Sequence, residues 1–316
     1  MPVLDPVAPD VNIPGMNATR DDIFACFRLL LGREPGPDET AAHMFYLGMP
    51  LDRVVSSYLG SLEFRNRNLT AGDAGAEEVR LDGYSVYVAK DDILIAPVIR
   101  AGYEPEVTQV FLDHLGTGLV IDVGANCGHF TMLAASRGAA VYAFEPLLRN
   151  VRLLHAGAVR NGFQSVRIIA AAASDLAGTL VIGASHTDGM VGEAGRNGVE
   201  AALSADYVAA VRIDDMVPRD RPVSLIKIDV EGHEYRALKG AMRTIAIWDP
   251  VILSEFAPAW LASSGHSGIE YLELLRGAGY SLAVVGRPEV TAPAAILELC
   301  GDTGHVDLLA TPNRRR

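Results

Sequence analysis

The spacing of apolar residues changes character near residue 75. Before that point apolar side chains recur at helical spacing, and after it short apolar runs alternate with helical stretches. The second pattern is typical of a mainly parallel sheet that is covered on both faces. We therefore predict three segments: a flexible, proline-rich N-terminus at 1–17, a small all-α domain at 18–70, and an α/β domain at 77–312.

Three helices are expected in the small domain. Thr19 suits a helix cap because acids follow it in the first turn. A second helix is expected after Pro37 and a third over Leu51–Phe64. The stretch 70–75, rich in glycine and alanine, is interpreted as a linker.

The longer domain contains seven candidate strands. A β-hairpin around Asp82-Gly83 precedes them, and the glycine-rich stretch Gly183–Ala205 interrupts them as a surface loop or lid. The candidates are Leu119–Val123, Ala140–Phe144, Val166–Ala173, Val223–Val230, Val251–Phe256, Ser281–Val285 and Val306–Ala310.

The first of these strands ends in an acid and turns at once through glycines. In Val120-Ile-Asp-Val-Gly-Ala-Asn-Cys-Gly-His-Phe-Thr131, Asp122 is followed by Gly124, Asn126 and Gly128. Such a turn forms a ligand cradle at the carboxyl edge of a parallel sheet. The spacing lacks the close glycine pair of a dinucleotide site, and Asp122 would repel a pyrophosphate. A cationic ligand fits better, and S-adenosylmethionine (SAM) carries an ammonium and a sulfonium.

Acids also close the next two predicted strands. Glu145 lies 21 residues after Gly124, at a place where an acid can bind ribose hydroxyls. Ser174 and Asp175 follow the third strand, where an acid could bind an adenine amino group. Taken singly, these acids could be a strand end or the start of a turn. Together with Asp122 they indicate partners for the amino-acid end, the ribose and the base of one ligand.

A second cluster of ionisable residues closes the fourth predicted strand, in Lys227-Ile-Asp-Val-Glu-Gly-His-Glu234. A hydroxyl that accepts a methyl group needs a base to take its proton. His233 is the candidate by its ordinary pKa, and Asp229 and Glu255 are rivals. Asp229, Glu231 and His233 could instead hold a divalent ion. We do not favour a metal, because a glycine interrupts the alternation of these side chains.

Charge and cysteine content narrow the classes of function. The 39 acidic and 27 basic residues give a formal net charge of −12, which argues against nucleic-acid binding. The 3 cysteines are far apart, so neither a disulfide framework nor a thiolate zinc site is expected. We see no signal-peptide core and no apolar run of the roughly 20 residues that a membrane helix needs. A cytoplasmic protein is expected.

Several segments of the longer domain occur together in a recognisable order. They are Tyr103-Glu104-Pro105, Asp122-Val-Gly-Ala-Asn126 with Gly128 and Thr131, Phe144-Glu-Pro146, Asn150, Ser174-Asp175, Leu225-Ile-Lys-Ile-Asp-Val-Glu-Gly-His-Glu234, Leu238-Lys-Gly-Ala241 and Val306-Asp-Leu-Leu-Ala310. Through them, residues 79–310 resemble the FkbM family of SAM-dependent methyltransferases. The resemblance implies a seven-stranded Rossmann-like methyltransferase sheet with helices on both faces. It also implies O-methylation of a hydroxyl and an approach of Glu104 to the cofactor's amino-acid end.

The helical domain has a weaker signature of its own. Leu30-Leu-Gly-Arg-Glu-Pro35 and Ser61-Leu-Glu-Phe-Arg65 are similar to segments of small modules that accompany glycan-processing enzymes. We expect this module to serve packing or homo-oligomerisation rather than glycan binding.

Together these observations predict a SAM-dependent O-methyltransferase. The expected acceptor is a hydroxyl of a sugar, glycan or glycosylated metabolite, with no nucleic-acid partner and no membrane span. Two alternatives remain at this point: a nicotinamide-dependent oxidoreductase, and a catalytically silent cofactor-binding or scaffold protein.

Overall fold

The chain divides into two compact units, Met1–Ala76 and Glu77–Arg316. The computed structural model describes residues 16–31, 33–59, 75–90, 92, 95–182, 191–192 and 206–313. Several predictions lie outside these residues: most of the flexible N-terminus, the end of the third helix with Ser61–Arg65, the linker before residue 75, and most of the loop Gly183–Ala205.

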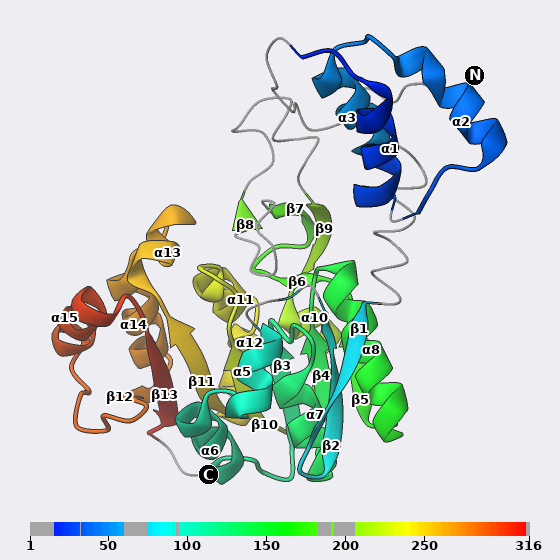
Figure 1. The fold of residues 1–316 in the computed structure, drawn as a ribbon. Coiled ribbons are helices and arrows are strands. Elements are labelled where there is room, and N and C mark those ends of the chain that lie inside the picture. The colour runs from blue at the N-terminus through cyan, green and yellow to red at the C-terminus, as the bar shows by residue number, and fades with distance from the viewer. Residues whose placement is uncertain are drawn as a thin grey trace. The chain divides into compact units, whose positions relative to one another are not determined.

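The N-terminal unit is helical, as its apolar spacing predicts (Figure 1). Its elements are α1 (Arg20–Leu29), α2 (Pro37–His43), the short 3₁₀ helix η1 (Met44–Tyr46) and α3 (Leu51–Leu59). Thr19 caps α1 in a reciprocal capping box with Asp22. Buried Phe27, Val54 and Tyr58 belong to one apolar core between the helices.

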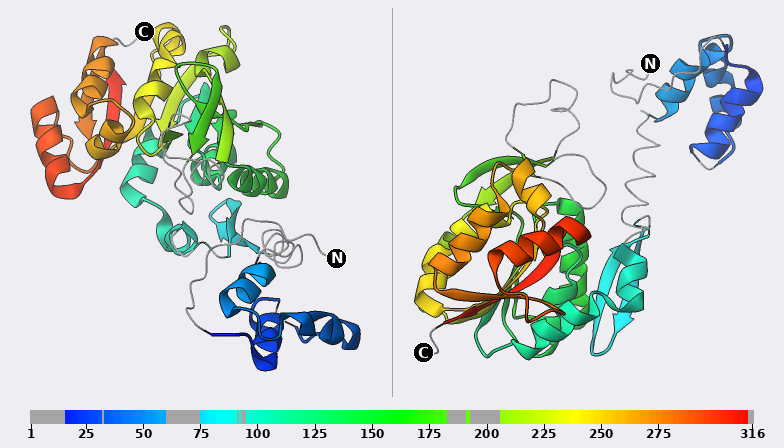
Figure 2. Two further views of the ribbon diagram at one scale, coloured as in Figure 1. Left: turned by 90° about the horizontal axis from the view of Figure 1, so that it is seen from above. Right: turned by 90° about the vertical axis from the view of Figure 1, so that its left-hand side faces the viewer.

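The second unit is built on a seven-stranded sheet, and the predicted α/β fold is confirmed (Figures 1 and 2). Each of the seven apolar runs supplies one strand of it. In spatial order the strands are β12 (Tyr280–Val284), β13 (Val306–Pro312), β11 (Val251–Phe256), β10 (Val223–Ile228), β3 (Leu119–Val123), β4 (Val141–Phe144) and β5 (Val166–Ile169). Only β13 is antiparallel to its neighbours. The strand order reverses between β3 and β10, which is where open α/β sheets bind ligands.

Helices cover both faces of this sheet. The described helices are α5 (Ile95–Gly102), α6 (Pro105–Asp113), α7 (His129–Ser136), α8 (Leu148–Asn161), α10 (Ile213–Met216), α11 (Glu234–Lys239), α12 (Met242–Trp248), α13 (Pro258–Ser263), α14 (Gly268–Gly277) and α15 (Pro293–Thr303). Residues of α10 to α15 share one core with alternate residues of the strands, including Ile121 and Ile226. Because strand side chains alternate between faces, Asp122 and Lys227 point to the opposite face, which α7 covers.

One strand prediction was wrong at its end. The apolar run Val166–Ala173 is not continuous, because β5 ends at Ile169 and a tight turn follows, in which Ala171 N–H donates to the Ile169 carbonyl. The chain then enters a separate four-stranded sheet. Its members, in spatial order, are β6 (Ala172–Ala173), β9 (Asp206–Val211), β7 (Gly178–Ile182) and β8 (Val191–Gly192).

The predicted hairpin is present as β1 (Ala76–Leu81) and β2 (Tyr84–Ala89). Ser85 N–H donates to Asn161 Oδ1 at 2.8 Å, and Asn161 Nδ2 returns a bond to the Ser85 carbonyl at 2.7 Å. These bonds fasten β2 to α8. Among the described residues, no helix is both long and apolar enough to cross a bilayer.

Candidate functional site

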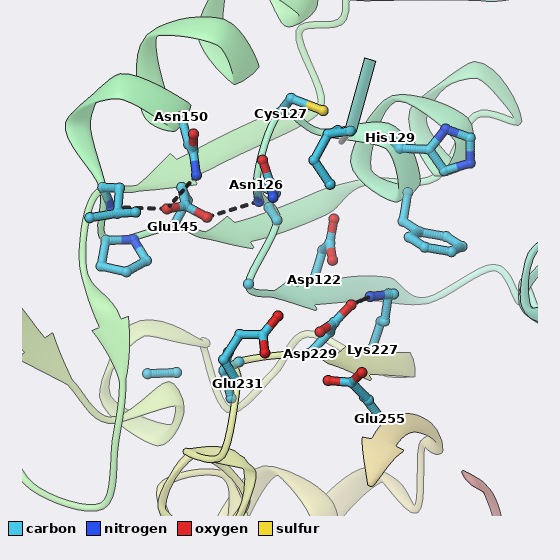
Figure 3. A pocket seen from close by; sticks show the side chains of 18 of the residues that line it. Asp122, Asn126, Cys127, His129, Glu145, Asn150, Lys227, Asp229, Glu231 and Glu255 are labelled. Carbon is cyan, nitrogen blue, oxygen red and sulfur yellow. Dashed lines mark hydrogen bonds and ion pairs between the residues drawn. The ribbon is translucent and has the colours of Figure 1, made fainter. Parts of the chain in front are cut away.

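A cavity lies at the carboxyl ends of β3, β4, β10 and β11, where the strand order reverses (Figure 3). Eight of the residues predicted as site residues line it: Glu104, Asp122, Gly124, Asn126, Glu145, Asp229, His233 and Glu255. The three others, Gly128, Ser174 and Asp175, are not among its described lining residues. The structure therefore brings together most of the predicted cofactor half and all of the predicted catalytic half.

The glycine turn after β3 needs its glycines for two different reasons. Both Gly124 and Gly128 have positive φ, at 82° and 96°. A Cβ on Gly124 would overlap the backbone oxygen of Asp229, so the turn passes directly over the end of β10. A Cβ on Gly128 would instead meet the side chain of Leu154 on α8. Gly128 thus packs the turn against a helix, whereas Gly124 brings the turn close to β10.

Glu145 at the end of β4 holds the same turn. Its carboxylate accepts backbone N–H bonds from Asn126 at 2.8 Å and from Leu147 at 2.9 Å, and Asn150 lies 3.4 Å away. The residue is only 4% exposed. Burial raises its pKa to about 7, although the backbone bonds oppose that shift. Glu145 is therefore a fixed hydrogen-bonding group in the cavity wall.

Asp122 is buried with half of its carboxylate unused. Thr131 Oγ1 donates to Oδ2 at 2.5 Å, while Oδ1 is buried and has no hydrogen-bond partner. Burial raises the pKa of Asp122, and the Lys227 charge and the Thr131 bond counteract part of the rise. A buried acceptor oxygen without a hydrogen-bond donor lowers the stability of the folded protein, and it is well suited to accept a hydrogen bond from a ligand.

Lys227 is a lining residue to which the sequence reasoning gave no role. Its ammonium lies 2.8 Å from Asp229 Oδ2 and 4.6 Å from the centre of the Phe130 ring. Burial alone would lower its pKa, but the charges of Asp229 and Asp122 outweigh burial and raise it. Lys227 thus stays protonated. The available signal was its position two residues before Asp229, which places the two side chains on the same side of an extended chain.

Three acids converge at the other end of the cavity, as Figure 3 shows. Carboxylate oxygens of Asp229, Glu231 and Glu255 all lie within 4.8 Å of one another. Burial, and then the charges of Asp229 and Glu231, raise the pKa of Glu255 to about 10. The three carboxylates are donors of the type that hard cations prefer. The Lys227 ammonium beside Asp229 opposes a further cation. The alternative ligand set considered from the sequence differs from this cluster in one member, since Glu255 stands here in place of His233.

His233 lines the cavity, but its ring is buried and contacts Ser174. The side chain is 3% exposed, and Nε2 lies 3.1 Å from Ser174 Oγ. Burial lowers its pKa to about 4, so the ring is uncharged at neutral pH and is a weak base. Ser174 also contacts Asp175, which forms an ion pair with Arg236 at 3.6 Å.

The predicted position of Ser174 and Asp175 needs correction for the same reason as the strand before them. They follow β6 of the small sheet rather than a strand of the seven-stranded sheet. Their side chains are engaged with His233 and Arg236 instead of lining the described cavity.

Glu104 is held near Lys227 by an unusual backbone. It precedes α6 with φ 41°, in the left-handed region where non-glycine residues are uncommon. Burial raises its pKa to about 7, and the Lys227 charge lowers it in part. Tyr103 beside it packs on the rings of His129 and Phe130, which fixes this segment to α7. Glu104 therefore meets the cavity from a helix outside the sheet.

Comparison with known proteins identifies the family to which this chain belongs. The model of the methyltransferase FkbM domain matches residues 122–282, half of the chain, and no curated protein matches the chain. Similar solved structures include the methyltransferase FkbM from Methylobacillus flagellatus KT, with 15% identity over 90% of this chain and 58% of that one, and a TM-score of 0.40. The chain thus spans 58% of that protein's structure.

Two further solved structures are similar at the same level. Magnesium protoporphyrin IX methyltransferase from Synechocystis PCC 6803, with bound SAM, shares 16% identity over 82% of this chain and 96% of that one, with a TM-score of 0.39. TYW2 of M. jannaschii, in complex with AdoMet, shares 14% identity over 75% of this chain and 84% of that one, with a TM-score of 0.37. On the match of its family model, which runs from Asp122 to Leu282, the chain belongs to the FkbM methyltransferases.

Proposed function

We propose that this protein binds SAM in the cavity and transfers its methyl group to a hydroxyl of a sugar, glycan or glycosylated metabolite. The observation that carries the proposal is the meeting of three strand-end acids, Asp122, Glu145 and Asp229, around one cavity at the point where strand order reverses. Membership of a methyltransferase family supports the reaction type.

The residues of the cavity fit SAM in charge and in hydrogen bonding. The unpartnered Oδ1 of Asp122 can accept a hydrogen bond from an ammonium group, and the Glu145 carboxylate can accept hydrogen bonds from ribose hydroxyls. The apolar side chains of Ile95 and Ile99 from α5 add a non-polar part of the wall. The carboxyl groups of Asp122 and Asp229 favour a positively charged ligand group beside them.

Bound there, SAM would supply a methyl group on a positively charged sulfur. The protein must then hold an acceptor oxygen in line with that group and remove its proton. We assign the role of the base that accepts this proton to the Asp229 carboxylate. Its side chain is 22% exposed and lines the cavity. The hydroxyl proton would pass to Asp229 as the oxygen–carbon bond forms and the carbon–sulfur bond breaks.

The two rival bases are less suitable in this geometry. His233 is almost fully buried and its Nε2 contacts Ser174 Oγ. Glu255, with a pKa raised to about 10, is protonated at neutral pH and so cannot accept a proton there. A protonated Glu255 can instead donate a hydrogen bond to an acceptor or to a neighbouring carboxylate.

Calorimetric titration with SAM is the first test. We expect binding in the micromolar range, and the same titration with NAD should show none. Binding of NAD but not SAM would replace the methyltransferase proposal with the oxidoreductase alternative.

The acceptor class needs a second measurement. The protein, labelled SAM and a panel of sugar and glycan extracts should yield a labelled product whose mass increases by one methyl group. Label that appears only in products lacking a sugar would overturn the proposed acceptor and leave the cofactor proposal standing.

A further inference from the structure

Asp122 and Lys227 stand side by side in the wall of the cavity. They are register partners on the parallel strands β3 and β10, so both side chains leave the sheet on the same face. Both line the cavity, and they are 1% and 5% exposed. In the part of the chain that the structure describes, no ion pair joins them. A buried carboxyl group and a buried ammonium group therefore lie next to each other without forming an ion pair.

Each of the two groups has hydrogen-bonding capacity left. Of the three N–H groups of the Lys227 ammonium, one donates to Asp229, and the Phe130 ring covers it from another side. Asp122 uses Oδ2 for Thr131 and leaves Oδ1 without a partner. Buried polar atoms normally have at least one hydrogen-bond partner, which Asp122 Oδ1 lacks. Spare donors beside a spare acceptor indicate a ligand that carries both kinds of group.

An α-amino acid is such a ligand. Its ammonium and carboxylate are attached to one carbon, so they can reach side chains on neighbouring strands, which lie about 4.8 Å apart. The carboxylate has few other partners here. Among the described residues that line the cavity, Lys227 is the only lysine or arginine. Burial lowers the pKa of both lining histidines, His129 and His233, to about 4, so neither is positively charged at neutral pH.

We propose that Lys227 binds the carboxylate of the methionine end of SAM while Asp122 binds its ammonium, so that the pair determines specificity for the intact amino-acid group. The inference rests on the proposed cofactor and adds a residue to its site. Lys227 then contacts two carboxylates at once, that of Asp229 and that of the ligand. Its charge also prevents the ligand carboxylate from being repelled by the surrounding acids.

The test compares SAM with decarboxylated SAM, which keeps the sulfonium and the amine but lacks the carboxylate. The quantity of interest is the ratio of the two dissociation constants, measured by calorimetry. Lys227→Met should weaken SAM relative to decarboxylated SAM by about 10-fold or more, as expected for a lost charged hydrogen bond. Lys227→Arg should restore most of the ratio. Asp122→Asn should weaken both ligands, because both retain the amine.

The ratio separates direct contact from a structural role. If Lys227 only supports Asp229, Lys227→Met will weaken both ligands equally, and the inference is overturned. Glu231→Gln controls for the general effect of one charge, because Glu231 also lines the cavity. The two variants remove charges of opposite sign, so a general charge effect would change the ratio of dissociation constants in opposite directions and by equal amounts. A change in Lys227→Met no larger than that in Glu231→Gln would therefore also overturn the inference.

Two further outcomes are distinguishable. Thermal unfolding shows whether Lys227→Met folds, and if it does not, the Lys227→Arg and Asp122→Asn variants decide. The inference is supported if Lys227→Arg leaves the ratio unchanged and Asp122→Asn weakens the binding of both ligands. Any other pair of results overturns it. If the wild-type protein binds decarboxylated SAM and SAM only at non-specific levels, the proposed function itself fails.

Discussion

The Glu145 carboxylate accepts the backbone N–H of Asn126 at 2.8 Å, so the acid that ends β4 holds the glycine turn that follows β3. A second oxygen of the same carboxylate accepts the Leu147 N–H at 2.9 Å. One buried side chain thus fixes the start of two ligand-facing segments. The proposed contact with ribose would add a further hydrogen bond to the same carboxylate.

Glu145→Gln tests this arrangement. The amide would place N–H groups where backbone N–H donors already point, so the turn should loosen and lose an acceptor for ribose. We expect SAM affinity to fall about 10-fold or more, by calorimetry. Thermal unfolding of the variant without ligand is the control, and wild-type affinity would contradict the proposed ribose contact.

Gly124→Ala should be far more damaging than Gly138→Ala. Both glycines have positive φ, at 82° and 86°, so alanine is strained at either position. Nothing lies within 4 Å of a Cβ on Gly138, whereas a Cβ on Gly124 overlaps the Asp229 backbone. Gly138→Ala should cost about 1 kcal/mol in urea unfolding. Gly124→Ala should cost clearly more and abolish SAM binding; equal costs would contradict the close approach of turn and strand.

Glu255→Gln should make the protein more stable at alkaline pH. The pKa of Glu255 is about 10 in the folded protein and 4.5 as its ordinary value. The folded state therefore holds a proton that the unfolded state loses, and this stabilisation is full below about pH 4.5 and is lost as pH rises toward 10. Glutamine cannot titrate, so the variant's advantage should grow by up to about 1.4 kcal/mol per pH unit.

Denaturant unfolding at pH 5 and pH 8 measures this difference. Glu298→Gln, at an exposed position, controls for the substitution itself. A constant difference between the Glu255→Gln variant and the wild type at both pH values would contradict the raised pKa.

Asp229→Asn and His233→Gln should separate the two candidate bases. Asp229→Asn removes the proton acceptor, so we expect methyl transfer to fall by about 10²- to 10⁴-fold. His233→Gln keeps a polar group that can reach Ser174 and should retain turnover within several-fold. Both are measured as the rate of label transfer to the acceptor found in the extract panel. The reverse ranking would assign the proton to His233.

The sequence was sufficient for the main sheet because its strands are short runs rich in apolar residues, and most of them begin or end beside a polar residue, a proline or a glycine. It failed after Ile169, where the chain leaves the sheet while the residues remain apolar, so that no change of pattern marks the turn. Strands β7 and β9 were not predicted either. The error in the predicted positions of Ser174 and Asp175 followed from the missed turn.

The site was predictable as far as it depends on strand ends. Asp122, Glu145 and Asp229 were identified because a parallel sheet brings its carboxyl ends to one edge. The partner of each side chain was not predictable in this way. That His233 reaches Ser174, and that Lys227 lies beside Asp122, depends on packing and register between segments far apart in the chain.

The small sheet of β6, β7, β8 and β9 is formed by the segment between β5 and β10. Its residues Ala172, Ala173 and Ile182 line the cavity. Because these four strands form a sheet of their own, a change of length within them need not alter the order of the seven strands. Selection can therefore reshape this part of the wall while the acids at the strand ends stay in place. If the cavity binds donor and acceptor as proposed, preference for an acceptor can diverge between relatives at a different rate from retention of the methyl donor.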